Sequence, residues 1–305
     1  MFALLAATLI WSFSFGIIKQ VLVGVPGDWL AFLRLALAAL VFLPFAWRAR
    51  LALPTRRLML IGGVQFGLMY LLYLQSFPYL AAWEVALFTV FTPVWVLLLD
   101  AIMTHDRSGK IRGREWLAVA ACVIGAWLVR ADPSERPDFG RGFLLVQGAN
   151  LCFAFGQVAY RRGLRFDPGR ADAAAHVWMF LGGAVIAGLA TATRLVRPFW
   201  SAPDDVIADL ALDGQQIAAL SYLGLVASGF GFYLWNAGAR RVSAGLLATM
   251  NNLKVPSAVA VSVLLFGEEF APSGEAGLWM RKLAGAAMVL AAVLFMTRSR
   301  RSTAK

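Results

Sequence analysis

The chain contains few of the residue types on which most enzymes and disulfide-bonded proteins depend. Its 305 residues include only two histidines and two cysteines, and only 15% of them are charged. Soluble domains carry about 25% charged residues, so this is the composition of a membrane protein. Cys122 and Cys152 both fall in apolar stretches, which argues against a disulfide, and nothing in the sequence indicates a metal site.

The motifs of the main alternative functions are missing as well. There is no His-Glu-x-x-His, no Gly-x-Ser-x-Gly and no aspartate-rich pair in an apolar stretch, and the histidines are only His105 and His176. Hydrolysis and prenyl transfer therefore lack visible groups. No Gly-x-x-x-x-Gly-Lys-[Ser/Thr] motif suggests ATP hydrolysis. We expect neither an enzyme nor a cofactor; a membrane-embedded enzyme or a channel-like facilitator is the alternative to a transporter.

What the chain has instead is ten long apolar stretches, within a sequence that is 60% hydrophobic. A helix needs about 20 apolar residues to cross the hydrocarbon core. The predicted fold class is an all-α polytopic membrane protein with ten transmembrane helices. The first stretch has no basic segment before it and no cleavage site after it, so we expect a retained helix. The predicted spans are residues 2–20, 29–47, 57–77, 82–102, 115–130, 141–160, 173–193, 215–237, 242–266 and 280–297.

The net charge of +11 is distributed unevenly over the connections between these spans. Alternate connections and the tail hold 18 of the 28 lysines and arginines, and the other connections hold eight. Short basic loops stay in the cytoplasm. The basic excess is therefore a topology signal and not a nucleic-acid site. It predicts a multi-pass protein of the bacterial inner membrane with both termini in the cytoplasm.

The first five spans resemble the last five. Phe13-Ser14-Phe15-Gly16 in the first span matches Phe153-Ala154-Phe155-Gly156 in the sixth. Five crossings leave the second copy upside down relative to the first, and inverted repeats are typical of secondary transporters. We expect one five-helix repeat over residues 1–131, a connection over 132–140, and a second repeat with a basic tail over 141–305.

A proline lies at the same place in the fourth and ninth spans. Pro93 and Pro256 each come about ten residues after their span begins. Proline removes a backbone donor and frees a carbonyl in the preceding turn. Matched interruptions in two halves are a pointer to a transport site, whereas the simpler alternative is a packing kink. We expect both prolines to form helix kinks that take part in gating, and Glu84 is a further gating candidate.

Five short segments occur in a characteristic order and spacing along the chain. They are Trp11-Ser12, Leu33-Arg34-Leu35-Ala36, Thr92-Pro93-Val94, the run from Tyr233 to Arg241, and Leu264-Leu265-Phe266-Gly267-Glu268. Together they resemble the EamA group of the drug/metabolite transporter superfamily over nearly the whole chain. The resemblance implies a ten-span exporter of amino acids or other metabolites, with a central cavity between its halves. The first half lacks the family's Gly-Glu ending and has Leu98-Leu99-Asp100 there instead.

Lys254 lies near the centre of the ninth span. A central lysine costs about 2.5–3.5 kcal/mol on insertion scales, so it faces a cavity or a partner. Asn251 and Asn252 are close by, one turn before Pro256. We predict that this cluster contacts the substrate, and the lysine favours an anionic one. Alternatively, Lys254 pairs with a helix carbonyl or with a carboxylate such as Glu84 and serves only stability.

Other polar and aromatic residues complete the predicted site. Arg34 follows Asp28 by six residues, so we expect it near the outer interface, snorkelling and forming a gating or structural ion pair. The glycines at positions 62, 63, 182, 183 and 188 are expected to allow close helix approach. The remaining substrate-binding candidates are Trp11, Ser14, Gln65, Tyr70, Asn150, Phe155 and Tyr233, although each polar one is more often a helix–helix hydrogen bond.

The sequence thus predicts a secondary transporter that exports a small metabolite, an amino acid or another carboxylate-bearing solute, by alternating access. The first span has no glutamate, which argues against a cation/proton antiporter of the small multidrug type. Besides the substrate and the lipid bilayer, protons are the one further partner considered, and whether a proton is exchanged is left open. We expect a monomer or a weak homodimer.

Overall fold

The computed structural model describes residues 2–49, 54–103, 138–163, 170–199, 211–239, 257–268 and 276–301, with 117, 120–121, 124–125, 128, 241 and 254–255. Every regular element among these residues is a helix. Seven helical segments are long and apolar enough to cross a membrane. An all-helical fold is expected in lipid, because a helix satisfies its backbone hydrogen bonds within its own segment.

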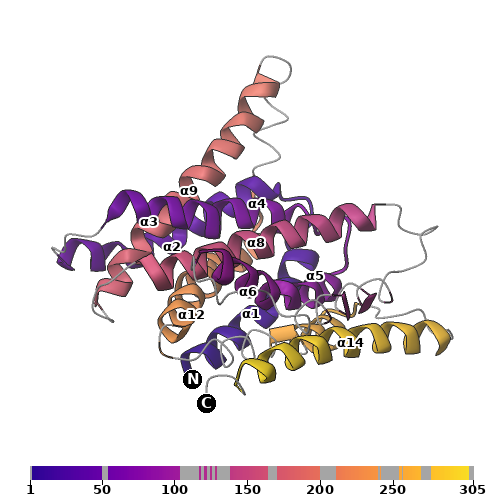
Figure 1. Ribbon diagram of the computed structural model, residues 1–305. Helices are drawn as coiled ribbons and strands as arrows, with labels where there is room; N and C mark the ends of the chain where they lie inside the picture. Colours follow the sequence, from indigo (N-terminus) through magenta and orange to yellow (C-terminus); the bar gives the residue numbers. More distant parts are fainter. Residues whose placement is uncertain are drawn as a thin grey trace.

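The seven segments coincide with seven of the ten predicted spans. Of the other three, the tenth is helical, and the fifth and ninth lie largely outside the described residues. Figure 1 shows the helices packed side by side, with α14 along one edge. The elements are α1 (Phe2–Gln20), α2 (Gly27–Ala49), α3 (Thr55–Gly62), η1 (Gly63–Leu68), α4 (Met69–Leu74), α5 (Ala82–Phe88), η2 (Thr89–Phe91), α6 (Thr92–Met103), α8 (Phe139–Gly163), α9 (Arg170–Phe199), α11 (Gly214–Ser221), η3 (Tyr222–Phe230), α12 (Gly231–Ala239) and α14 (Ala276–Arg301).

Two spans contain a π-helical stretch at the same distance from their start. Helix α3 lasts eight residues before η1 begins, and α11 lasts eight residues before η3 begins. Such stretches are rare and occur frequently at functional sites. Because η1 lies in the third span and η3 in the eighth, the matching interruptions support the internal repeat.

The packing of the helices also pairs the two halves. Helix α2 packs along α9, and each packs against the interrupted span of the other half: α2 against η3, and α9 against α3 and η1. Likewise α1 packs against α12, and α8 packs against α4 and η1. The predicted two-fold relation between the halves would produce this exchange of contacts. The inverted ten-helix repeat itself stays a prediction, since two of its spans fall largely outside the described residues.

Helices α3 and α9 approach each other through a reciprocal pair of glycines. A Cβ atom added to Gly62 would lie 2.0 Å from the carbonyl oxygen of Met179, and one added to Gly182 would lie 2.1 Å from the carbonyl oxygen of Met59. Only hydrogen fits at these two positions. The close approach that the sequence predicts for these glycines is confirmed.

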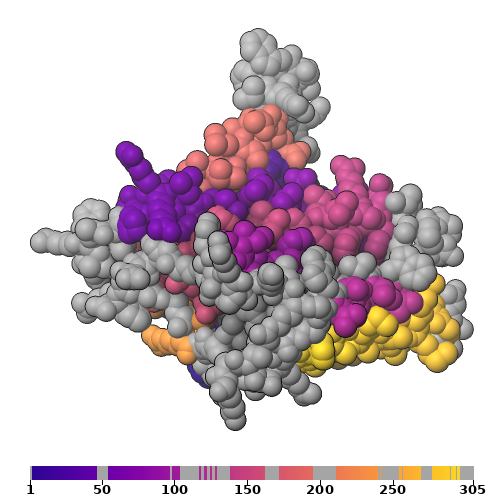
Figure 2. Space-filling model, in the orientation of Figure 1, coloured from indigo at the N-terminus to yellow at the C-terminus, as the bar shows by residue number. Residues whose placement is uncertain are grey.

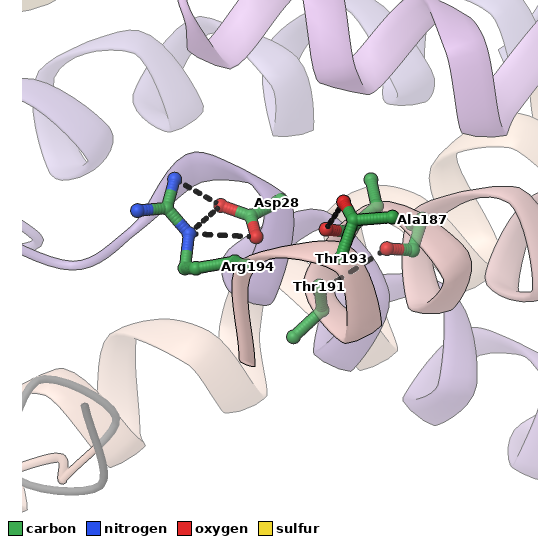
Figure 3. Close-up of polar contacts among 6 residues, drawn as sticks. Asp28, Ala187, Thr191, Thr193 and Arg194 are labelled. Atoms are coloured by element: carbon green, nitrogen blue, oxygen red, sulfur yellow. Dashed lines mark hydrogen bonds and ion pairs between the residues drawn. The ribbon is translucent and has the colours of Figure 1, made fainter. Parts of the chain in front are cut away.

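An ion pair joins the start of α2 to the end of the seventh span. The Arg194 Nε donates to both carboxylate oxygens of Asp28 at 2.8 Å, and its Nη2 lies 2.7 Å from Oδ1 (Figure 3). Arg194 is half exposed, so the pair contributes at most about 1 kcal/mol. Beyond this point the last turns of α9 extend out of the bundle (Figure 1). In the space-filling view the coloured part of α9 rises above the neighbouring helices (Figure 2).

Candidate functional site

A central cavity lies between the two halves of the bundle. The space inside it that atoms do not fill is about 560 Å³, including the part open to solvent. The residues that line it are Trp11, Ser14, Phe15, Arg34, Met69, Tyr70, Tyr73, Thr89, Thr92, Ala149, Asn150, Phe153, Phe232 and Lys254.

The interruption before Pro93 is closed by protein groups. Pro93 has no N–H for the Thr89 carbonyl, which accepts instead from the Thr92 hydroxyl at 2.7 Å. The 3₁₀ turn η2 likewise changes the bonding of the Phe88 carbonyl, which accepts from Asn150 Nδ2 at 2.9 Å. The hydrogen bond from Asn150 therefore connects α8 to the fourth span. Thr89, Thr92 and Asn150 still line the cavity. The role of the kink in gating stays a prediction.

Trp11 forms one wall and holds the π-helical stretch η3 in place. Its Nε1 donates to the Ala227 carbonyl at 2.8 Å. Its ring lies 5.1 Å from that of Phe232 and 5.2 Å from that of Trp235, between ring centroids. The Lys254 Nζ lies 5.7 Å from the centre of the Trp11 ring, within the range of a cation–π interaction. A wall of this kind suits an apolar or aromatic part of a ligand.

Arg34 lies on the cavity wall and not at the membrane surface. Only 2% of it is exposed, so the predicted snorkelling is wrong. Its Nη2 donates to the Tyr70 hydroxyl at 2.7 Å, its Nε donates to the Ser228 hydroxyl at 3.2 Å, and the two hydroxyls are 2.9 Å apart. In place of the predicted ion pair, the partners among the described residues are hydroxyl groups. The reason is that α2 packs against η3, which brings Ser228 to Arg34.

Lys254 also reaches the cavity and is 6% exposed. Together with Arg34 it gives the wall two cationic side chains. No aspartate or glutamate is among the lining residues of the described structure. The three neighbours predicted to act with Lys254, namely Asn251, Asn252 and Pro256, lie outside the described residues. The electrostatics of the cavity favour a ligand of negative charge.

The structure brings six of the predicted residues together at the cavity and leaves four away from it. Phe155 is half-buried. Tyr233 packs its ring against Phe42, at 5.3 Å between centroids. Gln65 is buried where Gly156 lets α8 approach η1. Glu84 accepts a hydrogen bond from the Ala81 N–H at 2.7 Å, at the start of α5. The six at the cavity are Trp11, Ser14, Arg34, Tyr70, Asn150 and Lys254.

Sequence reasoning missed several lining residues. Thr92 immediately precedes Pro93, and Thr89 lies four residues before it. A carbonyl freed by the proline needs a hydroxyl donor nearby, and this requirement could have indicated both threonines. Phe15 and Phe153 stand in the repeated Phe-x-Phe-Gly segments, which pointed to the repeat and not to the cavity. Phe232 and Met69 gave no signal of their own, because a large apolar residue on an apolar helix is far more often part of the packing.

The Gly-Glu ending of the ninth span joins the two halves. Gly267 has a φ of 66°, a conformation that favours glycine. The Glu268 carboxylate that follows accepts hydrogen bonds from the N–H groups of Ala82 and Trp83, at 3.0 and 3.1 Å. Both N–H groups lie in the first turn of α5, which has no intrahelical carbonyl for them and where a carboxylate is stabilising. The second half therefore holds the start of the fourth span.

Comparison with known proteins gives consistent matches. The model of the EamA-like transporter family matches residues 1–131 and 140–298. A biotin transporter of Salmonella typhimurium is 35% identical over 95% of this chain and 90% of its own length, and that of Escherichia coli K12 gives the same values. A probable biotin transporter of Pseudomonas aeruginosa is 36% identical over 92% of this chain and 96% of its own length. A solved crystal structure with 17% identity covers 100% of this chain and 98% of its own, with a TM-score of 0.66, which shows a shared fold.

Proposed function

The chain belongs to the EamA-like transporter family, and from this we propose that it carries a small carboxylate-bearing solute across the bacterial inner membrane by alternating access. Membership makes it a multi-pass membrane transporter of a small molecule and not an enzyme. The finer statements, namely the substrate, the alternating access and the export direction implied by the family resemblance, are the proposal.

One observation supports a carboxylate in particular. The cavity wall combines the cations Arg34 and Lys254 with aromatic rings, and its described lining includes no acidic residue. An amino acid substrate would bring an ammonium group that needs an acceptor of negative charge. The lining therefore favours an acid with an apolar body over an amino acid.

Biotin is the first solute to test. The relatives named as biotin transporters share about a third of their residues with this chain over almost its full length. Biotin has one carboxylate, an aliphatic chain and a neutral bicyclic ring, and the cavity wall offers both cations and aromatic rings to such a molecule. We propose biotin, or an acid built in the same way, as the substrate.

Purified protein in liposomes is expected to take up radiolabelled biotin in a saturable manner, well above empty liposomes. A carrier coupled to protons accumulates biotin when a proton gradient is imposed, whereas a channel-like facilitator only equilibrates it. Lysine serves as the control solute and is expected not to move. No flux of biotin, nor of any member of a panel of organic acids, would contradict the proposed function.

Replacing Lys254 with methionine is expected to lower biotin uptake at least about tenfold and to leave the fold intact. Loss of the cation removes attraction for the anion in a cavity of low dielectric constant. Methionine is an unbranched apolar side chain that adapts to irregular packing, so the variant should still fold. Uptake and melting in detergent measure the two effects. Lys254→Arg is the control and should retain part of the transport; wild-type uptake by Lys254→Met would exclude a role in binding.

A further inference from the structure

We infer that Arg34, and not Lys254, binds the carboxylate of the substrate, and that Tyr70 and Ser228 are the residues that position its guanidinium. The inference rests on the proposed function, because it requires that the transported solute carries a carboxylate. It differs from what the sequence predicts, which is a gating or structural ion pair for Arg34.

The hydrogen bonds around Arg34 leave donors for a ligand. A guanidinium has five N–H groups. One on Nε is used by Ser228 and one on Nη2 by Tyr70, and Nη1 has no hydrogen-bond partner in the described structure. Two N–H groups on Nη1 and one on Nη2 are therefore available. This number fits a carboxylate, which accepts two parallel N–H bonds from one arginine.

The two hydroxyls add a further donor. Tyr70 and Ser228 form one hydrogen bond between them, which uses one hydroxyl hydrogen. Each hydroxyl also accepts from Arg34, so the second hydroxyl hydrogen is not used within the cluster. The cluster of Arg34, Tyr70 and Ser228 thus offers three N–H groups and one O–H group to a ligand, against a single remaining hydroxyl lone pair, and it carries a positive charge. Its chemistry selects an anion.

Burial explains why such a cluster has a function. Arg34 is 2% exposed and lines the cavity, and its partners among the described residues are neutral hydroxyls. A buried cation is costly unless an anion compensates it. The Tyr70 ring, 4.3 Å below the guanidinium, and the two hydroxyls orient the charge but do not neutralise it. We conclude that the substrate supplies the compensating charge.

Lys254 has a different geometry. Its ammonium lies over the Trp11 ring and is a compact point charge without the planar fork of arginine. It raises the positive potential of the cavity but imposes no paired geometry on a carboxylate. Arg34 in addition connects the halves, because Tyr70 follows the π-helical stretch η1 and Ser228 lies within η3. A carboxylate bound here contacts the point at which both interrupted spans meet.

The test compares biotin with biotinamide, in which a neutral amide replaces the carboxylate, as competitors of biotin uptake into proteoliposomes. The wild type is expected to prefer biotin by about tenfold to a hundredfold, the range for hydrogen bonds to a charged group. In Arg34→Gln the preference is expected to fall to within about threefold of unity. In Lys254→Gln biotin uptake weakens, but the preference stays above about tenfold.

Three results would overturn the inference: no preference in the wild type, a wild-type preference in folded Arg34→Gln, or a preference abolished by Lys254→Gln alone. If Arg34→Gln does not fold, Arg34→Lys keeps the charge and removes the fork. It should then raise the KM for biotin about tenfold, and an unchanged KM would contradict the proposal. A wild type that transports no organic acid at all refutes the proposed function instead, so the two failures are distinct.

Discussion

Gly62→Ala and Gly182→Ala are each expected to remove most of the folded protein. The added methyl group would lie 2.0 or 2.1 Å from a backbone carbonyl oxygen of the facing helix, a position that no side-chain rotation can relieve. Overpacking typically costs about 1–3 kcal/mol of stability. A methyl group pressed against a backbone carbonyl should cost at least about 3 kcal/mol, because the backbone cannot move aside as a side chain can. Size-exclusion yield and the thermal midpoint in detergent would measure the loss.

Gly140 in α8 and Gly277 in α14 offer matched controls for these two variants. A Cβ atom at either position meets no atom within 4 Å. Alanine favours a helix over glycine by about 1 kcal/mol, so Gly140→Ala and Gly277→Ala should leave stability unchanged or raise it slightly. Equal stability of Gly62→Ala and Gly140→Ala would mean that α3 and α9 do not approach as closely as described.

Trp11→Ala is expected to abolish transport and to lower stability by about 3 kcal/mol. The change removes a side chain that is 8% exposed, its ring contacts, and the donor to the Ala227 carbonyl. It also removes one wall of the cavity. Biotin uptake and thermal unfolding in detergent would report the two losses separately.

Two further variants separate the causes of that loss. Trp11→Phe keeps most of the packing but leaves the Ala227 carbonyl without its donor, so we expect a cost of about 1–2 kcal/mol. Trp279→Ala makes the same deletion on α14 at a residue that is 41% exposed, where the effect should stay below about 1 kcal/mol. A loss at Trp279 as large as that at Trp11 would contradict the role given to Trp11.

The length of the apolar stretches predicted most of the fold. Seven spans lie where runs of about 20 apolar residues placed them, because a helix satisfies its backbone hydrogen bonds within its own segment. The stretches η1 and η3 could not be predicted. The sequence Gly63-Val-Gln-Phe-Gly-Leu68 reads as an ordinary apolar turn, and its π-helical bonding depends on the helices that pack against it.

The candidate site was predictable residue by residue only in part. Lys254 and Trp11 could be identified because a charge or a repeated aromatic segment stands out in an apolar run. The position of Arg34 differs from the prediction: it is buried at the cavity and does not reach the membrane interface. The distance from a span end does not indicate which neighbouring helix covers a side chain. Ser228 brings Arg34 into the cavity, and that contact joins residues 194 positions apart in the chain.

The hydrogen bonds between Glu268 and the start of the fourth span are not equally sensitive to mutation on their two sides. Its donors are the backbone N–H groups of Ala82 and Trp83, which every residue except proline supplies. Mutations at these two positions can change the side chain freely without removing the donors. On the other side, the acceptor is a single carboxylate at the end of the second half. A mutation of Glu268 therefore removes this link between the halves, whereas most mutations of Ala82 or Trp83 leave it in place.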